Sequence, residues 1–141
     1  FKPQPSIKTL ANAMDVGNPS NLERFIELTH RDDSLRVRIR AVSIDDATIR
    51  ETILAGPARY ARIWCPHTAV AVRAREMQNS PDWIVVSTAH PAKFSEIVEP
   101  LLGHTVLMPP QLQALLDKPS ECVEIGAQYS ELRQVLNSPR M

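Results

Sequence analysis

The spacing of apolar residues predicts a series of short helices separated by prolines and turn residues. Ser20-Asn21-Leu22-Glu23 matches a capping box and precedes apolar residues that share one side of a helix. Asp45 or Asp46 can cap a second helix, for which Gly56-Pro57 supplies a stop signal. Prolines open three further helical patterns, because proline is tolerated in the first turn. The helices predicted in this way cover residues 22–30, 46–55, 66–74, 91–102, 110–116 and 129–136.

Other segments have the patterns of extended chain. Residues 35–41 alternate apolar residues with three arginines, which predicts an edge strand with its guanidinium groups on one face. That face is either a solvated surface or a site for phosphate or nucleic acid. Residues 82–87 form a nearly continuous apolar run, typical of a strand buried on both faces of a parallel sheet. Residues 7–14 and 60–65 are compatible with short extended segments. Helices that alternate with one or two strands predict the α/β class.

Composition narrows the possible functions. The chain has 141 residues, of which 43% are hydrophobic, so one compact unit is expected. Lys+Arg and Asp+Glu both number 16, and this balance argues against a nucleic-acid partner. The apolar runs are too short for a membrane span. Cys65 and Cys122 lie far apart and read as free thiols, which favours the cytoplasm. The start at Phe1 indicates a piece of a longer polypeptide.

Three segments could carry chemistry, although each also has a structural interpretation. Ser87-Thr88-Ala89-His90 follows the predicted strand 82–87, at the sheet edge where ligands bind in open α/β folds. Thr88 could cap the next helix or bind a ring nitrogen. His67 could be a catalyst, a cap or a packed polar group. Asn12 and Asp15 precede a turn, and they could either stabilise this turn or bind a ligand. Neither a metal motif nor a nucleotide-binding motif is present.

The same segments resemble sequence blocks of the threonine synthase family. Thr9 to Asn21 is similar to its Asn-Ala-Met-Asp-Val block, Pro66 to Val70 to its Pro-His-Thr-Ala-Val block, and Ser87 to Phe94 to a third block. The resemblance covers residues 6 to about 103, in the family's order. It implies the C-terminal portion, over residues 1–141, of a fold type II pyridoxal phosphate (PLP) enzyme, with few strands and flanking helices. Residues from about 104 to 141 are then expected to form a peripheral helical tail.

The resemblance also implies residues that bind PLP. The hydroxyl of Thr88 would face the pyridine nitrogen, supported by His90. Asn12, Ala13 and Met14 would line one face or edge of the ring, and His67 would stand near its 3-oxygen. The chain departs from the family at two positions: Cys65 stands where many members have Asp, and Ala71 where many have Gly.

The expected reaction converts O-phospho-L-homoserine and water into L-threonine and phosphate. The Schiff-base lysine and the glycine-rich phosphate cradle of the family match nothing in this chain, and Lys93 is expected to be structural or a surface charge. No catalytic residue is therefore assigned, and the N-terminal part of the same enzyme is the expected partner. Two alternatives remain open: a related PLP phospho-lyase, and a non-catalytic domain that binds another chain.

Overall fold

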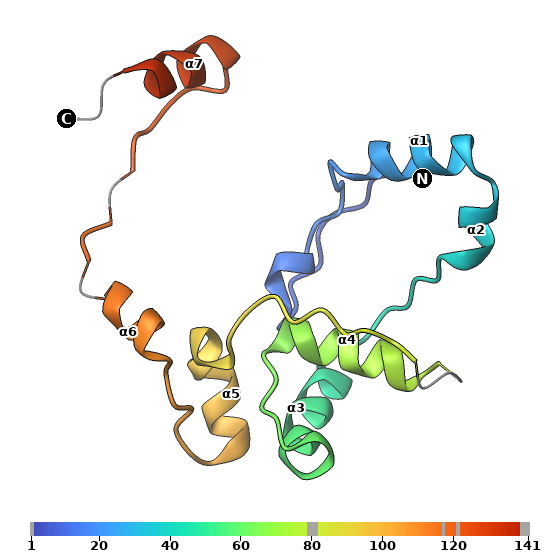
Figure 1. Cartoon of the computed structure of the whole chain (residues 1–141), viewed down its shortest axis with the longest axis vertical. Coiled ribbons are helices and arrows are strands. Elements are labelled where there is room, and N and C mark those ends of the chain that lie inside the picture. Colours follow the sequence, from blue (N-terminus) through green and yellow to red (C-terminus); the bar gives the residue numbers. More distant parts are fainter. Residues whose placement is uncertain (1, 79–81, 117, 121, 139–141) are drawn as a thin grey trace. The chain divides into compact units, whose positions relative to one another are not determined.

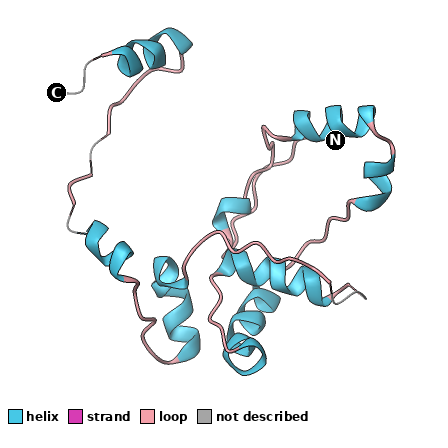
Figure 2. Ribbon diagram, in the orientation of Figure 1, coloured by secondary structure: helices cyan, strands magenta, loops and turns pink. Residues whose placement is uncertain are grey.

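The structure, a computed structural model, describes residues 2–78, 82–116, 118–120 and 122–138, and within these ranges it contains helices and loops but no strand (Figures 1 and 2). The chain divides into two compact units, Phe1–Leu107 and Met108–Met141. The elements of the first unit are η1 (Asn12–Met14), α1 (Leu22–Arg31), α2 (Ser34–Arg38), α3 (Asp46–Tyr60), α4 (Pro66–Glu76), η2 (Pro91–Phe94) and α5 (Ser95–Leu102). The second unit contains α6 (Pro110–Leu116) and α7 (Tyr129–Asn137).

The core of the first unit lies where α3 packs against α4 and α5 (Figure 1). Ile49 and Ile53 are spaced by one helical turn and are both fully buried, as are Ala69 of α4 and Val98 of α5. Burial of a side chain of the size of isoleucine contributes about 1.5–3 kcal/mol. This small core therefore fixes α4, and with it the residues at the start of α4.

Helix starts follow the local signals in the sequence. The Asp45 carboxylate accepts a hydrogen bond from the Thr48 backbone N–H at 2.8 Å and caps α3. This bond lowers the pKa of Asp45 below its ordinary value. Pro66 occupies the first turn of α4. The capping box at Ser20 does not form, because Asn21 holds the N-cap position of α1 and makes no side-chain cap bond.

The predicted stop of α3 at Gly56-Pro57 is wrong. The helix continues through both residues to Tyr60, and Ala61 ends it in the left-handed region at φ 50°. The backbone N–H of Ala61 donates a hydrogen bond to the carbonyl of Pro57 at 3.1 Å. Gly56 is buried in the helix, where the indole of Trp64 lies against it. Tertiary packing thus overrides the local stop signal.

The strand predicted at residues 35–41 is also wrong, since Ser34–Arg38 forms α2. The Asp32 carboxylate accepts from the Ser34 N–H at 2.9 Å, and this local bond favours a helical turn. The arginines therefore do not form the row expected on one face of a strand. Arg36 instead faces Asp33 at 3.8 Å, an exposed ion pair of little energetic weight.

The sheet expected from the α/β class is not observed in the described residues. Residues 82–88 are neither helix nor strand, and residues 62–65 are likewise irregular. Ile84 is 93% exposed, so the segment predicted to be buried on both faces is not buried here. A strand needs a neighbouring strand to bond its backbone N–H and C=O groups, and the described part of this chain offers none.

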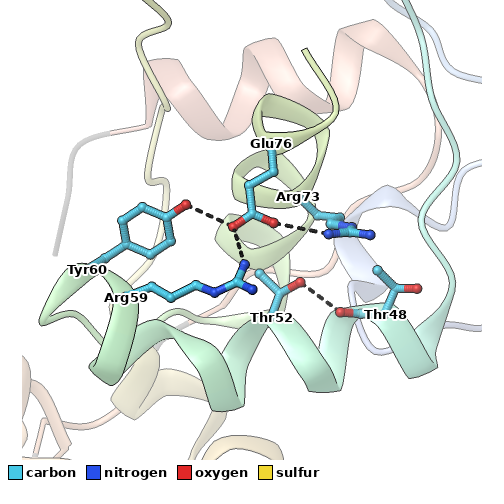
Figure 3. A network of polar contacts seen from close by, with 6 residues as sticks. All are labelled: Thr48, Thr52, Arg59, Tyr60, Arg73 and Glu76. Carbon is cyan, nitrogen blue, oxygen red and sulfur yellow. Dashed lines mark hydrogen bonds and ion pairs between the residues drawn. The ribbon is translucent and has the colours of Figure 1, made fainter. Parts of the chain in front are cut away.

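A polar network joins the ends of α3 and α4 (Figure 3). The Glu76 carboxylate accepts from the Tyr60 hydroxyl at 2.8 Å and from the guanidinium groups of Arg59 and Arg73, each at 3.2 Å. Partial burial raises the pKa of Glu76, but these three bonds outweigh it and hold the pKa below its ordinary value. The bond to Glu76 raises the pKa of the Tyr60 hydroxyl. The charged form of Glu76 therefore stabilises the packing of α3 on α4.

This network predicts a pH-dependent stability. Because the folded state lowers the pKa of Glu76, its contribution is full above the ordinary value of 4.5 and is lost as the pH falls through the folded-state pKa. We expect Glu76→Gln to cost about 1 kcal/mol at neutral pH and to flatten the acid limb of the stability curve. Urea unfolding at several pH values measures both effects. Glu96→Gln, an exposed change on α5, serves as the control; equal acid limbs for Glu76→Gln and the unsubstituted chain would contradict the assignment.

None of the described helices combines the length and apolar character required to cross a bilayer.

Candidate functional site

The N-terminus of α4 is the place where the predicted site residues meet. Cys65 caps the helix, and its Sγ accepts from the Thr68 N–H at 3.4 Å. Residues 65–69 are all buried. A proline in the first turn and a cap of this kind begin the helix sharply. His67 and Thr68 are therefore held rigidly on the first turn of α4.

His67 joins this turn to η1. Its Nε2 atom accepts a hydrogen bond from the backbone N–H of Ala13 at 3.1 Å, across 54 residues of sequence. The imidazole also packs on the ring of Phe94, with centroids 4.9 Å apart. Asn12, Ala13 and Met14, predicted to line a cofactor, thus lie beside the predicted His67. Their own side chains are exposed.

Thr68 joins the same turn to the third predicted segment. Its Oγ1 atom hydrogen-bonds with Ser87 Oγ at 3.1 Å and with Cys65 Sγ at 3.2 Å. Because Ser87 directly precedes Thr88, this contact fixes the Thr88 segment against the first turn of α4. Sequence reasoning missed Thr68 as a site residue, although its place three residues after the helix cap was a usable signal.

Thr88 lines a cavity of about 750 Å³. The hydroxyl of Thr88 makes no hydrogen bond within the described ranges, and η2 is capped by His90, whose Nδ1 accepts from the Ala92 N–H at 3.2 Å. The capping role considered for Thr88 therefore belongs to His90. The cavity wall consists of Ala61, Arg62, Ile63, Trp64, Ser87, Thr88, Ala89, His90, Pro91, Val106 and Leu107.

Met14 lines a second cavity of about 400 Å³ beside η1, together with Asp15. The Asp15 carboxylate accepts from the Thr9 hydroxyl at 2.6 Å and from the Thr9 N–H at 2.7 Å. These bonds lower the pKa of Asp15. The structure thus brings η1 to His67 but places Met14 and Thr88 in the walls of different cavities. Lys93 is exposed and lines neither.

The arrangement offers a ligand a hydroxyl group at a cavity wall, that of Thr88. In the part of the chain that the structure describes, no cluster of three or more His, Cys, Asp or Glu residues could hold a metal ion. Nδ1 of His67 has no hydrogen-bond partner among the described residues, but it is buried and His67 lines neither cavity. A hydroxyl can donate a hydrogen bond to a ligand atom or accept one from it.

Comparisons with known proteins find one family model and several relatives. Residues 68–136 match the family model described as threonine synthase, C-terminal. Threonine synthase of Escherichia coli (strain K12) is 34% identical over 138 residues, and that of Serratia marcescens is 33% identical. Each alignment covers 96% of this chain and 32% of the relative. The chain therefore spans about a third of the length of the relatives that it matches.

Solved structures show the same relationship. The crystal structure of threonine synthase from Escherichia coli matches with a TM-score of 0.74 and 34% identity, over 96% of this chain and 32% of that one. A PLP-bound threonine synthase from Brucella melitensis matches with a TM-score of 0.63 at 22% identity, over 96% and 35%. The second likeness shows the fold alone.

The fold of the described chain is similar to that of part of two threonine synthases. The first two sequence blocks meet at the start of α4, and the third is bonded to it through Ser87. The chain is similar to the C-terminal part of threonine synthases. The alignments and the family model also carry the relationship well past residue 103, where the resemblance of the sequence blocks ended.

Proposed function

We propose that the chain forms the C-terminal part of a PLP-dependent threonine synthase, which converts O-phospho-L-homoserine and water into L-threonine and phosphate. The observation that carries this proposal is the bonding of η1 and Ser87 to one helix turn, through His67 and Thr68. Segments far apart in sequence come together there through the polar side chains of His67 and Thr68. The reaction is that of the threonine synthases to which the chain is similar.

The groups of this chain that could contact PLP are the Thr88 hydroxyl, at the wall of one cavity, and Met14, at the wall of another. We assign Thr88 to the pyridine nitrogen, Asn12, Ala13 and Met14 to the ring face or edge, and His67 to the side of the 3-oxygen. PLP, when bound, supplies an electron sink for the substrate's carbanionic steps. A neutral hydroxyl at the ring nitrogen moderates that sink.

The remainder of the site is assigned to the N-terminal part of the same enzyme. That part would contribute the Schiff-base lysine and the glycine-rich phosphate cradle, as the family resemblance implies. The residues of this chain then bind and orient the ring rather than form bonds with it. We assign residues from about 104 onward to a peripheral helical tail. The buried Cys65 and exposed Cys122 are both free thiols, which supports the cytoplasm as the compartment.

A chimera tests the proposal. The C-terminal third of the Escherichia coli relative is replaced by this chain, and the product is incubated with PLP and O-phospho-L-homoserine. We expect threonine and inorganic phosphate in equal amounts, and neither product from the 141-residue chain alone. Amino-acid analysis and a phosphate assay measure them. Phosphate accompanied by a 2-keto acid would instead indicate a phospho-lyase, and a chimera without PLP absorbance would favour a non-catalytic domain.

Thr88 offers a sharper test within the same chimera. Thr88→Val removes the hydroxyl and keeps the shape, so we expect PLP to bind about tenfold more weakly, the loss typical of one hydrogen bond in a dry site. Thr105→Val, at another exposed threonine, is the matched control and is expected to bind PLP unchanged. Titration of PLP absorbance gives both dissociation constants. Equal constants for the two variants would remove Thr88 from the site.

A further inference from the structure

Residues 83–86 have the sequence Trp-Ile-Val-Val and yet lie largely on the surface. Ile84 is 93% exposed and Val86 is 68% exposed, whereas Val85 is half-buried. A run of apolar and β-branched side chains of this kind is typical of a strand that is buried on both faces. The segment therefore combines the sequence of an interior strand with the exposure of a surface loop.

The backbone of this segment is also unpaired. No N–H or C=O group of residues 83–86 forms a hydrogen bond with another described residue. Water can solvate these groups in the isolated chain, but a row of free backbone donors and acceptors is a template on which a further strand can pair. Both the side chains and the backbone thus indicate a missing neighbour.

A groove beside α4 marks the place of this neighbour. The segment runs back along α4, and the hydroxyl of Ser87 joins its end to Thr68 (Figure 1). The groove has a volume of about 460 Å³, and residues 83–86 line it together with Ala71 and Ala74 of α4. Apart from three arginines and one glutamine, its lining is apolar. Because alanine side chains are short, another segment of chain can come close to α4 there.

The occupant is indicated by the length of chain that lies outside this sequence. The chain covers 32% of each of its threonine synthase relatives. A strand from the remainder of such a polypeptide is covalently linked to the groove, so that its pairing is intramolecular and occurs at a high effective concentration. A second copy of this chain has no such advantage.

We propose that residues 83–86 dock a β-strand from the N-terminal part of the same enzyme, and that this strand fills the groove beside α4. The added strand supplies partners for the free backbone groups and buries the side chains of Ile84 and Val86. The proposal rests on the proposed function for the identity of that part. Pairing also fixes the chain next to Thr88, which stands two residues after Val86.

Hydrogen exchange at the amides of Ile84, Val85 and Val86 tests the docking. In the 141-residue chain alone we expect these amides to exchange as fast as those of an unfolded peptide. In the chimera with the Escherichia coli relative we expect exchange to be slowed about hundredfold. The Ile53 amide, inside α3, should be protected in both proteins and serves as the control.

Two results would overturn the proposal. One is fast exchange of the three amides in the chimera. The other is protection in the isolated chain that grows with protein concentration, which would identify a second copy of the chain as the occupant.

Ile84→Pro and Ile84→Val distinguish strand pairing from burial alone. Proline removes the backbone N–H that a paired strand needs, whereas valine keeps this N–H and the β-branched shape. In the isolated chain the N–H has no partner, so both variants should unfold at the same urea concentration as the unsubstituted chain. In the chimera, Ile84→Pro should lose the protection of Val85 and Val86, and Ile84→Val should keep it. Equal protection in the two chimeras, or a lower urea midpoint for Ile84→Pro in the isolated chain, would contradict the docking of a strand.

The docking surface and the proposed function can fail separately. A chimera with protected amides at residues 84–86 that forms no threonine would refute the proposed function and support the docking surface. A chimera that forms threonine while these amides exchange fast would refute the docking surface and leave the proposed function standing.

Discussion

Thr68→Val should destabilise the fold by about 2 kcal/mol and weaken PLP binding by the chimera about tenfold. Valine keeps the shape of threonine but removes the hydroxyl that joins Cys65 and Ser87. Thr68 is 1% exposed, so water cannot replace the lost contact on its side. Without that contact the Ser87-Thr88 segment loses its bond to α4, and the position of the Thr88 hydroxyl becomes less well defined. Urea unfolding and PLP titration measure the two effects.

A second buried threonine provides the control. Thr52 is buried in α3, and its hydroxyl donates to the Thr48 carbonyl of the same helix at 2.8 Å. That carbonyl is already used by the helix, so Thr52→Val should cost less than about 1 kcal/mol and leave PLP binding unchanged. Thr68→Ser, which keeps the hydroxyl, should retain most of the PLP affinity. If both valine variants bind PLP alike, the Ser87 contact does not position the Thr88 segment.

The helices could be predicted because their signals are local. The cap at Asp45 and the prolines at residues 66, 91 and 110 each act within one turn, and each opens a helix in the structure. The strands could not be predicted in the same way, because a strand exists only when a neighbour accepts its backbone hydrogen bonds. Residues 35–41 do alternate apolar residues with arginines, but the hydrogen bond from the Ser34 N–H to Asp32 favours the helix α2 there.

The sequence yielded candidate site residues but not the contacts between them. The family resemblance named His67, Thr88 and the Asn12 segment, and their contribution to PLP binding stays a prediction. The contact of His67 with Ala13 spans 54 residues and leaves no periodic trace in the sequence. The bridge from Thr68 to Ser87 was missed for the same reason. Tertiary hydrogen bonds between short polar side chains become visible only once the helices are packed.

Gly56→Ala should destabilise the fold by about 1–3 kcal/mol, although alanine is the better helix former by about 1 kcal/mol. A Cβ atom at residue 56 would lie 2.6 Å from the carbonyl oxygen of Arg62 and 2.8 Å from Cδ1 of Trp64. The Arg62 carbonyl belongs to the backbone and the Trp64 indole is packed against α3. Neither can move away from the added Cβ atom unless the turn after α3 also moves. Trp64 and Arg62 also line the 750 Å³ cavity, and its wall should therefore move with them. Thermal unfolding and tryptophan fluorescence measure the change.

Gly103→Ala is the matched control, because it measures only the strain that a left-handed backbone imposes on a residue with a Cβ atom. Gly103 ends α5 at φ 73°, and a Cβ atom there would meet nothing within 4 Å. Only the left-handed backbone is penalised, by about 1 kcal/mol, and tryptophan fluorescence should not change. Gly56→Ala carries no such penalty, so its cost must come from contact with Arg62 and Trp64. A stabilised Gly56→Ala variant with unaltered fluorescence would contradict the packing of the Trp64 indole against α3. It would also contradict the place of Trp64 in the cavity wall.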